Sequence, residues 1–176
     1  MNVVKFTKFE YAMFGVLGYT SLSLGTVYYN MYLKEKEVRT LLRYACFISC
    51  FGALLNLTFA YRLNLQLGIK DIYYILFTDV VLGTLGLAYS QLPTMVLFAK
   101  ITPSNIEASC FAFLTGTLNF SNGVLSPMIG TKVNEWFVGV TSEDLSNYKT
   151  LVLISFMTSF IPFAYLWMIP LKDDIK

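Results

Sequence analysis

The sequence contains no histidine, and only 14% of its 176 residues are charged. Soluble domains are about one quarter charged, so this chain has too little polar surface to cover a globule of its size. The absence of histidine removes a common general base and metal ligand. The sequence also lacks a nucleophile elbow, a phosphate-binding glycine-rich loop and paired intramembrane aspartates. We therefore expect that the chain is not an enzyme.

Cysteine is scarce, and the three that occur, Cys46, Cys50 and Cys110, all lie inside apolar runs. Cys46 and Cys50 are four residues apart, so they share one face of a helix. A metal site needs further nitrogen, oxygen or sulfur ligands nearby, and no histidine exists to supply them. We expect the cysteines to pack as small apolar residues, with neither a metal nor a cofactor bound.

Charge of one sign is not concentrated anywhere in the sequence. The net charge is +2, and the only dense run, residues 34–37, alternates lysine with glutamate. This alternation is typical of a short solvated loop. We therefore exclude nucleic acid as a partner.

Apolar residues dominate what is present, at 56% of the chain, with aromatics at 16%. A helix needs about 20 apolar residues to cross roughly 30 Å of hydrocarbon. Five runs are long enough, and none alternates as a membrane barrel strand does. We predict an all-α integral membrane protein in which residues 1–176 form a single membrane domain of five transmembrane helices. The predicted helices are Phe9–Leu33, Thr40–Tyr61, Asp71–Lys100, Asn105–Ile129 and Thr150–Pro170.

Prolines and caps predict where these helices bend or begin. Pro93, Pro127 and Pro162 lie within or near the ends of apolar runs, where a missing N–H kinks a helix. At the start of the fourth run, Thr102 is a candidate N-cap, and Ser104 and Glu107 have the spacing of a capping box.

Small or polar residues recur at helical spacing in each of the first four runs. Lipid gives apolar helix faces no hydrophobic reason to associate, whereas small residues allow close approach and polar ones supply hydrogen bonds. These stripes predict a packed bundle or a larger complex. The residues that we expect at helix contacts are Gly18, Gly25, Ala53, Asn56, Gly83, Gly86, Ala112 and Gly116.

Asp79 lies near the middle of the third run. A carboxylate at that depth costs at least about 2.5–3.5 kcal/mol unless it is paired, protonated or hydrated. Two interpretations stay open: a substrate or proton site that faces a polar cavity, or a hydrogen bond to an asparagine on another helix. Glu107 is either a cap or a ligand contact, and the asparagines either bind a ligand or join helices. The candidate substrate-binding residues are Asp79, Glu107, Asn119 and Asn122.

A family resemblance is carried by residues between Leu67 and Gly130. They are Leu67-Gly68-Ile69 with Asp71, then Asp79, Pro93, the block from Ala99 to Ala108, and Asn119, Ser126 and Gly130. This set resembles the folate–biopterin transporter family, a branch of the major facilitator superfamily. The block is similar to the family's alanine, proline and glutamate–alanine pattern between its tenth and eleventh helices. Where Asn105 stands the family often has glycine, and asparagine tolerates similar backbone angles.

The resemblance implies the C-terminal half of a carrier, covering about helices eight to twelve. Members of the family resemble two six-helix halves with the substrate held between them. One half cannot rock against a missing partner, so we expect no transport by this chain alone. We favour a non-catalytic accessory subunit packed in the membrane part of a larger complex. The alternative is half of a split or fragmentary folate or pteridine transporter that moves substrate with a companion chain.

The expected partners follow from these two hypotheses. They are the lipid bilayer, other membrane-protein subunits or a companion transporter half, and a folate or pteridine ligand. Either an organellar inner membrane or the plasma membrane is compatible with the sequence. A homo-oligomeric channel is disfavoured, because the stripes contain small residues rather than rings of charge.

Overall fold

The structure is a computed structural model that describes residues 7–171, apart from the side chains of Tyr11 and Asp79. Every regular element in that range is a helix, which confirms the predicted all-α class. The α-helices are α1 (Lys8–Tyr28), α2 (Val38–Ala60), α3 (Leu63–Gln66), α4 (Asp71–Leu76), α5 (Gly83–Gly86), α6 (Leu92–Ile101), α7 (Glu107–Phe120), α8 (Ser126–Val133) and α9 (Tyr148–Thr158). Segments of π-helix, namely η1 (Tyr29–Leu33), η2 (Phe77–Leu82), η3 (Leu87–Gln91), η4 (Ser121–Leu125) and η5 (Asn134–Val138), and the 3₁₀-helix η6 (Ile161–Met168) extend them.

Three helical stretches are long and apolar enough to cross a membrane, judged by length and composition. They are Val38–Ala60, Asp71–Ile101 and Tyr148–Met168. They correspond to the second, third and fifth predicted runs. The helical stretches 8–33 and 107–138 do not meet these criteria, so the described residues support three of the five expected spans. Glycine, serine, threonine and tyrosine residues lower the mean hydropathy of the stretch 8–33, and polar residues that include Asn119 and Asn122 lower that of 107–138.

The first helix begins at a capping box that our sequence analysis did not anticipate. The Thr7 Oγ1 accepts a hydrogen bond from the Glu10 N–H, and the Thr7 N–H donates to the Glu10 carboxylate at 2.6 Å. These bonds satisfy backbone groups that have no partner inside the helix. The helix therefore starts at Lys8, one residue before the predicted run.

The turn between α6 and α7 differs from the predicted one. Thr102 precedes Pro103 and is extended, with φ −76° and ψ 124°, so it ends α6 rather than beginning a helix. The N-cap of α7 is Ile106, which has no side-chain capping bond, and the predicted Ser104–Glu107 capping box does not form. Asn105 has φ +81°, the left-handed geometry that asparagine tolerates.

Each predicted proline break coincides with a change of helix type. Pro93 lies in the first turn of α6 just after η3, and Pro127 lies in the first turn of α8 just after η4. Pro162 lies in the first turn of η6. Because proline has no N–H, the preceding turn loses a hydrogen bond and widens or tightens there.

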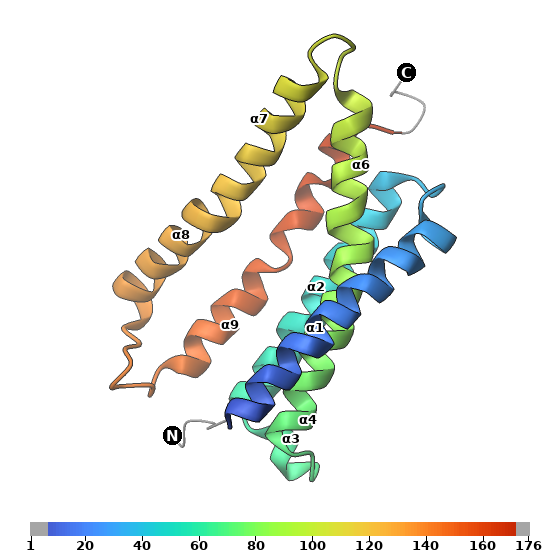
Figure 1. The fold of residues 1–176 in the computed structure, drawn as a ribbon. Helices are drawn as coiled ribbons and strands as arrows, with labels where there is room; N and C mark the ends of the chain where they lie inside the picture. The colour runs from blue at the N-terminus through green and yellow to red at the C-terminus, as the bar shows by residue number, and fades with distance from the viewer. Residues whose placement is uncertain (1–6, 172–176) are drawn as a thin grey trace.

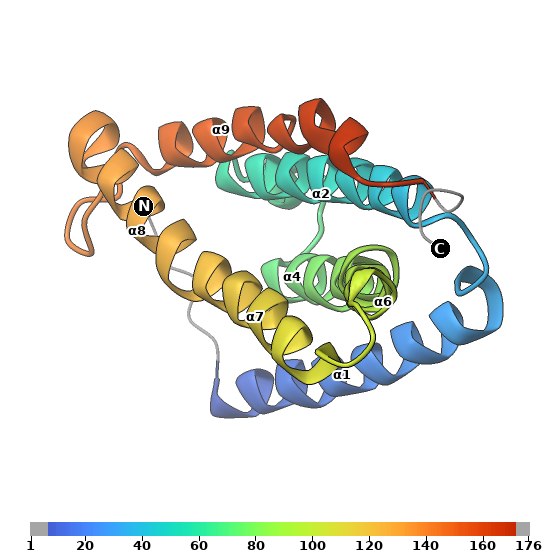
Figure 2. The ribbon, with the colours of Figure 1, turned by 90° about the horizontal axis from the view of Figure 1, so that it is seen from above.

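The helices pack around the stretch from α4 to α6. This stretch contacts α1 on one side and α2 on the other, and α9 runs along α2 (Figure 1, Figure 2). Buried side chains of η1, α2 and η3 form the main apolar cluster, namely Tyr29, Leu33, Leu41 and Ala88. The stretch from α7 to η5 lies apart from this group, with its main contacts to α6 at one end and to α9 at the other.

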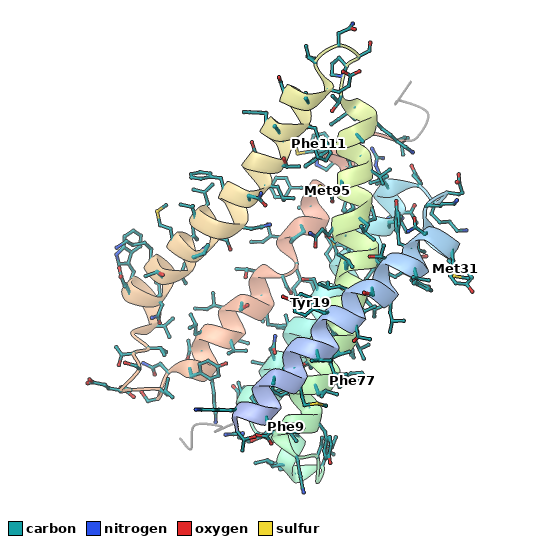
Figure 3. The ribbon with its side chains drawn as sticks, in the orientation of Figure 1. Phe9, Tyr19, Met31, Phe77, Met95 and Phe111 are labelled. Atoms are coloured by element: carbon teal, nitrogen blue, oxygen red, sulfur yellow. The ribbon has the colours of Figure 1, made fainter. Side chains whose placement is uncertain are left out.

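Large apolar side chains point outward along α1. Figure 3 shows Phe9, Tyr19 and Met31 on the outside of the bundle, and Tyr19 is 76% exposed. An apolar surface of this kind is stable in lipid and would be costly in water. The exposed faces are therefore those of a membrane protein.

Candidate functional site

The contact between α1 and the central stretch is held by small and hydroxyl residues. Ser21 is only 2% exposed, and its hydroxyl donates to the Val80 carbonyl oxygen at 2.8 Å and also contacts the Thr84 hydroxyl. One turn further on, a Cβ added to Gly25 would lie 3.0 Å from the Thr84 carbonyl oxygen. The absence of a side chain at Gly25 thus permits this close approach of the two helices.

A cavity of about 1310 Å³ lies between α2, the stretch from η2 to α6, the α7–η4 stretch and the α9–η6 segment. Two of the predicted stripes line it together. Cys46, Ser49, Ala53 and Asn56 belong to α2, whereas Gly83, Gly86 and Ser90 belong to the central stretch. Met95, on the side of α6 that faces α7, adds an apolar contact (Figure 3).

The lining of the cavity contains many polar side chains. Among the described residues that line it, none is acidic or basic. Asparagine and glutamine amides offer both donors and acceptors, and hydroxyl groups can do either. The cavity can therefore hold a solute that presents alternating donors and acceptors. The polar lining residues are Ser49, Asn56, Thr78, Ser90, Gln91, Thr94, Asn119, Asn122, Ser155, Thr158, Ser159 and Tyr165.

The four candidate substrate-binding residues do not all reach this cavity. Asn119 and Asn122, at the end of α7 and in η4, line it. The backbone of Asp79 lies in η2, but its side chain is outside the described part of the structure. Glu107 is exposed at the first position of α7 and is not a lining residue. Asn56, which we expected at a helix contact, lies on the cavity wall with the two asparagines.

The predicted packing residues fall into two groups. Gly25 lies at a close contact between helices, as does Gly52, whose added Cβ would meet Leu82 at 3.1 Å. We had not singled out Gly52, although it shares the small-residue content of α2. The close approach expected at the other glycines is not found, since an added Cβ would meet nothing within 4 Å at Gly18, Gly83, Gly86 and Gly116. Ala112 is exposed, and Ala53 lines the cavity.

The turn between α2 and α4 contains residues that carried the family resemblance. Gly68 has φ +73°, a conformation that side-chain-bearing residues rarely adopt. The Asp71 carboxylate accepts from the Arg62 Nη1 at 2.8 Å and from the Asn64 Nδ2 at 2.7 Å. The buried Asn64 amide also donates to the Ile69 carbonyl. These contacts fix the start of the central stretch relative to α2.

Apolar helices with exposed apolar side chains and a shared cavity with polar groups on its described lining define a helical integral membrane protein with room for a polar solute. The sequence model of the BT1 family matches residues 1–176, the whole of the sequence. The chain belongs to the BT1 family. The resemblance to folate–biopterin transporters is thereby confirmed.

Curated relatives carry names of transporters. The chain is 30% identical over 150 residues to the folate-biopterin transporter of Synechocystis sp., a match that covers 85% of the chain. It is 28% identical to the probable folate-biopterin transporter 9, chloroplastic, of Arabidopsis thaliana over 158 residues, covering 90% of the chain. It is 23% identical over 153 residues to folate transporter 1 of Plasmodium falciparum, covering 87% of the chain. No solved structure matches the chain.

The chain spans only about 30% of the length of these relatives, namely 30%, 29% and 30% of the three in the order given. The family is one of transporters rather than enzymes, which agrees with the expectation of no enzyme activity. Family membership and the apolar helices together show a transporter-derived integral membrane protein.

Proposed function

We propose that this chain forms part of the membrane pathway of a folate or pteridine carrier and acts with further membrane helices. The observation that carries the proposal is the cavity, whose described lining offers many polar groups, in a chain that matches the BT1 family throughout. The further helices belong either to a companion chain or to additional sequence of the same polypeptide. We propose a part of a carrier in place of the accessory subunit that the sequence alone favoured, because an accessory role gives no reason for a polar cavity.

We further propose that the stretches 8–33 and 107–138 also lie in the membrane, giving five embedded helices. Tyr19 on α1 and Phe113 on α7 are each more than 70% exposed, at 76% and 72%. Large apolar side chains are stable on such surfaces when lipid or another apolar helix covers them. The lower hydropathy of these two stretches comes from polar residues that an internal face accommodates.

The cavity amides are the proposed ligand contacts. The pterin ring of folate presents ring nitrogens, an amino group and a carbonyl oxygen along one edge. The amides of Asn56, Asn119 and Asn122 can pair with such an edge, since each carries two donors and an acceptor. Asp79 is proposed as an acceptor for the ligand's amino group. Glu107, which is exposed at the outer end of α7, would meet a ligand only at an entrance.

The test is a chimera that uses the chain within a complete carrier. Residues of this chain replace the matched region of the Synechocystis transporter, and uptake of tritiated folic acid into proteoliposomes is measured. We expect uptake above that of empty liposomes, and competition by unlabelled pterin. A chimera inserted at the parental level that takes up no folate would contradict the proposal. If the chimera takes up no folate and the chain co-purifies with a membrane complex, the accessory role would be supported.

A further inference from the structure

Four tyrosines from three parts of the fold form a continuous row of rings near one end of the bundle. The ring centroids of Tyr28 in α1 and Tyr32 in η1 are 5.3 Å apart. The Tyr89 ring of η3 lies 6.3 Å from that of Tyr28 and 6.1 Å from that of Tyr44 in α2. These separations are typical of aromatic rings in contact. The four residues, which we call the tyrosine row, thus span α1, the central stretch and α2 near the turn that joins η1 to α2 (Figure 1).

The tyrosine row lies at the surface and offers hydroxyl groups to an outside partner. Tyr32 is 60% exposed and Tyr44 is 54% exposed, and their hydroxyls bond to none of the described residues. The hydroxyl oxygens of Tyr28 and Tyr89 are 3.3 Å apart, so one donates to the other and the second O–H stays available for another acceptor. A tyrosine on the outside of a membrane protein keeps its ring in the acyl region and its hydroxyl among the headgroups. The row therefore indicates where the surface of this end meets the headgroup layer.

Two exposed basic side chains flank the tyrosine row. Lys34 follows Tyr32 by two residues, and Arg43 directly precedes Tyr44. Neither forms an ion pair with a residue that the structure describes, and the ion pair of Arg62 lies at the other end of α2. Long basic side chains near helix ends extend their charge into the headgroup layer. Both charges are thus available to an anion beside the row.

The acidic residues of the same turn do not cancel this positive charge. Glu37 stands at the N-cap position of α2, where the helix dipole favours a carboxylate, and it accepts a hydrogen bond from the Thr40 hydroxyl at 3.2 Å. Glu35 is the other acidic residue of the turn. Residues 34–43 hold four basic residues against these two, which leaves an excess of positive charge. The four are Lys34, Lys36, Arg39 and Arg43.

We propose that the tyrosine row, with Lys34 and Arg43, binds the headgroup of an anionic phospholipid. The two cations face the lipid phosphate, and the tyrosine hydroxyls donate to phosphate or ester oxygens. An excess of positive charge attracts an anionic headgroup and disfavours a second cation such as the choline group. The inference concerns the outer surface of the bundle and does not rest on the cavity or on the proposed function.

The occupant is a lipid rather than a soluble anion because the surroundings of the row are apolar. Met31, in η1 between the first two tyrosines of the row, points outward and is 65% exposed (Figure 3). The exposed ring faces of Tyr32 and Tyr44 add further apolar surface. Acyl chains cover such a surface, whereas a free phosphate leaves it in contact with water.

Photoreactive lipids test the site in the Synechocystis chimera, in which the rest of a carrier is present and can cover whatever it normally covers. Liposomes contain a trace of phosphatidylglycerol or of phosphatidylcholine, each with the same diazirine in its acyl chain next to the glycerol. After irradiation, mass spectrometry measures the label on residues 28–44. We expect phosphatidylglycerol to label this segment at least about tenfold more than phosphatidylcholine, since two cations contribute. An excess of glycerol phosphate in the buffer should leave the label unchanged.

A charge variant with a matched control locates the recognition. Lys34→Gln with Arg43→Gln should lower the phosphatidylglycerol label to the phosphatidylcholine level. Lys8→Gln with Lys70→Gln removes the same charge from exposed positions at the other end of the bundle and should leave the label unchanged. Every variant is compared at equal membrane insertion and with an unchanged size-exclusion profile, so a folding defect in any of them is seen.

A hydroxyl variant separates hydrogen bonding from ring packing. Tyr28→Phe with Tyr89→Phe keeps both rings and removes the hydroxyl pair, so the phosphatidylglycerol label should fall while the phosphatidylcholine label stays the same. Tyr19→Phe is the control, because Tyr19 lies on α1 outside the row and is 76% exposed. It should change neither label.

Four results would overturn the inference. Equal labelling by the two lipids would show ordinary bilayer contact without headgroup recognition, and loss of label with glycerol phosphate would show a site for a soluble anion. A segment that neither lipid labels would show that another part of the carrier covers the row. An equal loss of label in the Lys8 and Lys70 variant would show a response to total charge. Folate uptake is not measured in these experiments, so none of these results bears on the proposed function.

Discussion

The guanidinium of Arg39, at the start of α2, caps the end of the last helix through the carbonyl oxygen of Ile169. The Arg39 Nε donates to this oxygen at 2.7 Å, and Nη2 donates both to it and to the Trp167 carbonyl oxygen at 3.2 Å. Carbonyls at the end of a helix have no partner inside it. Arg39 therefore joins two helix ends that are 130 residues apart in the sequence.

Arg39→Ala is expected to lower the free energy of unfolding by about 1.5–3 kcal/mol, the range for hydrogen bonds to charged groups. Arg39→Lys should recover only part of this, because one ammonium cannot reproduce the planar fork. Thermal unfolding in mild detergent measures both, with Arg43→Ala, an exposed arginine one turn further on, as the control. Equal unfolding temperatures for Arg39→Ala and Arg43→Ala would show that the cap contributes nothing.

Gly25→Leu is expected to disrupt the packing of α1 on the central stretch. Even a Cβ there lies 3.0 Å from the backbone oxygen of Thr84, which cannot rotate away. Overpacking costs typically about 1–3 kcal/mol. Gly18→Leu is the matched control, because a Cβ at Gly18 meets nothing within 4 Å. The fraction of protein that stays folded in detergent, measured by size-exclusion chromatography, should fall for Gly25→Leu and stay unchanged for Gly18→Leu.

Ser21→Ala is expected to weaken the same contact through its hydrogen bond. The variant leaves the Val80 carbonyl oxygen without the donor that Ser21 provides. Hydrogen bonds between membrane helices average about 0.6 kcal/mol and reach about 1.7. Ser23→Ala, which removes only a bond within the exposed side of α1, should have no measurable effect on stability. A Ser21 variant as stable as the Ser23 variant would argue against the bond.

The loop between η5 and α9 should depend on pH through Asp144. The Ser146 N–H donates to its carboxylate at 2.9 Å, and this bond to the backbone holds the pKa of Asp144 below its ordinary value. A lowered folded-state pKa means that the ionised carboxylate supports the turn at neutral pH, and that this support is lost as the pH falls through the folded pKa. Hydrogen exchange of the Ser146 amide should accelerate there relative to neighbouring loop amides. Asp144→Asn should abolish this pH dependence.

Composition and long apolar runs were enough to predict an all-helical membrane protein, because lipid leaves few alternatives to a helix. The turn at Thr102 was mispredicted, since Pro103 forces the preceding residue to be extended and this outweighs the capping pattern. Gly25 and Gly18 could not be told apart from sequence. Both lie on α1 as small residues, and only the position of the neighbouring helix decides which one is at a contact.

The sequence predicted which residue types belong to the candidate site, but it did not predict where in the fold these residues come together. Helical spacing put Asn56 and Ala53 on one face of α2 and Gly83 and Gly86 on one face of the central stretch. Whether such faces close on each other or surround a space depends on how the long helices cross, which spacing alone does not determine. The structure puts all four on the wall of one cavity.

The central claim is that the cavity amides hold the carried solute, and one uptake measurement tests it most directly. In the Synechocystis chimera, Asn119→Ala with Asn122→Ala is compared with Asn30→Ala, an exposed asparagine in η1 away from the cavity. We predict that the double variant raises the KM for folic acid at least tenfold, while Asn30→Ala leaves it unchanged at equal membrane insertion. Unaltered KM and maximal uptake rate in the double variant would contradict the account.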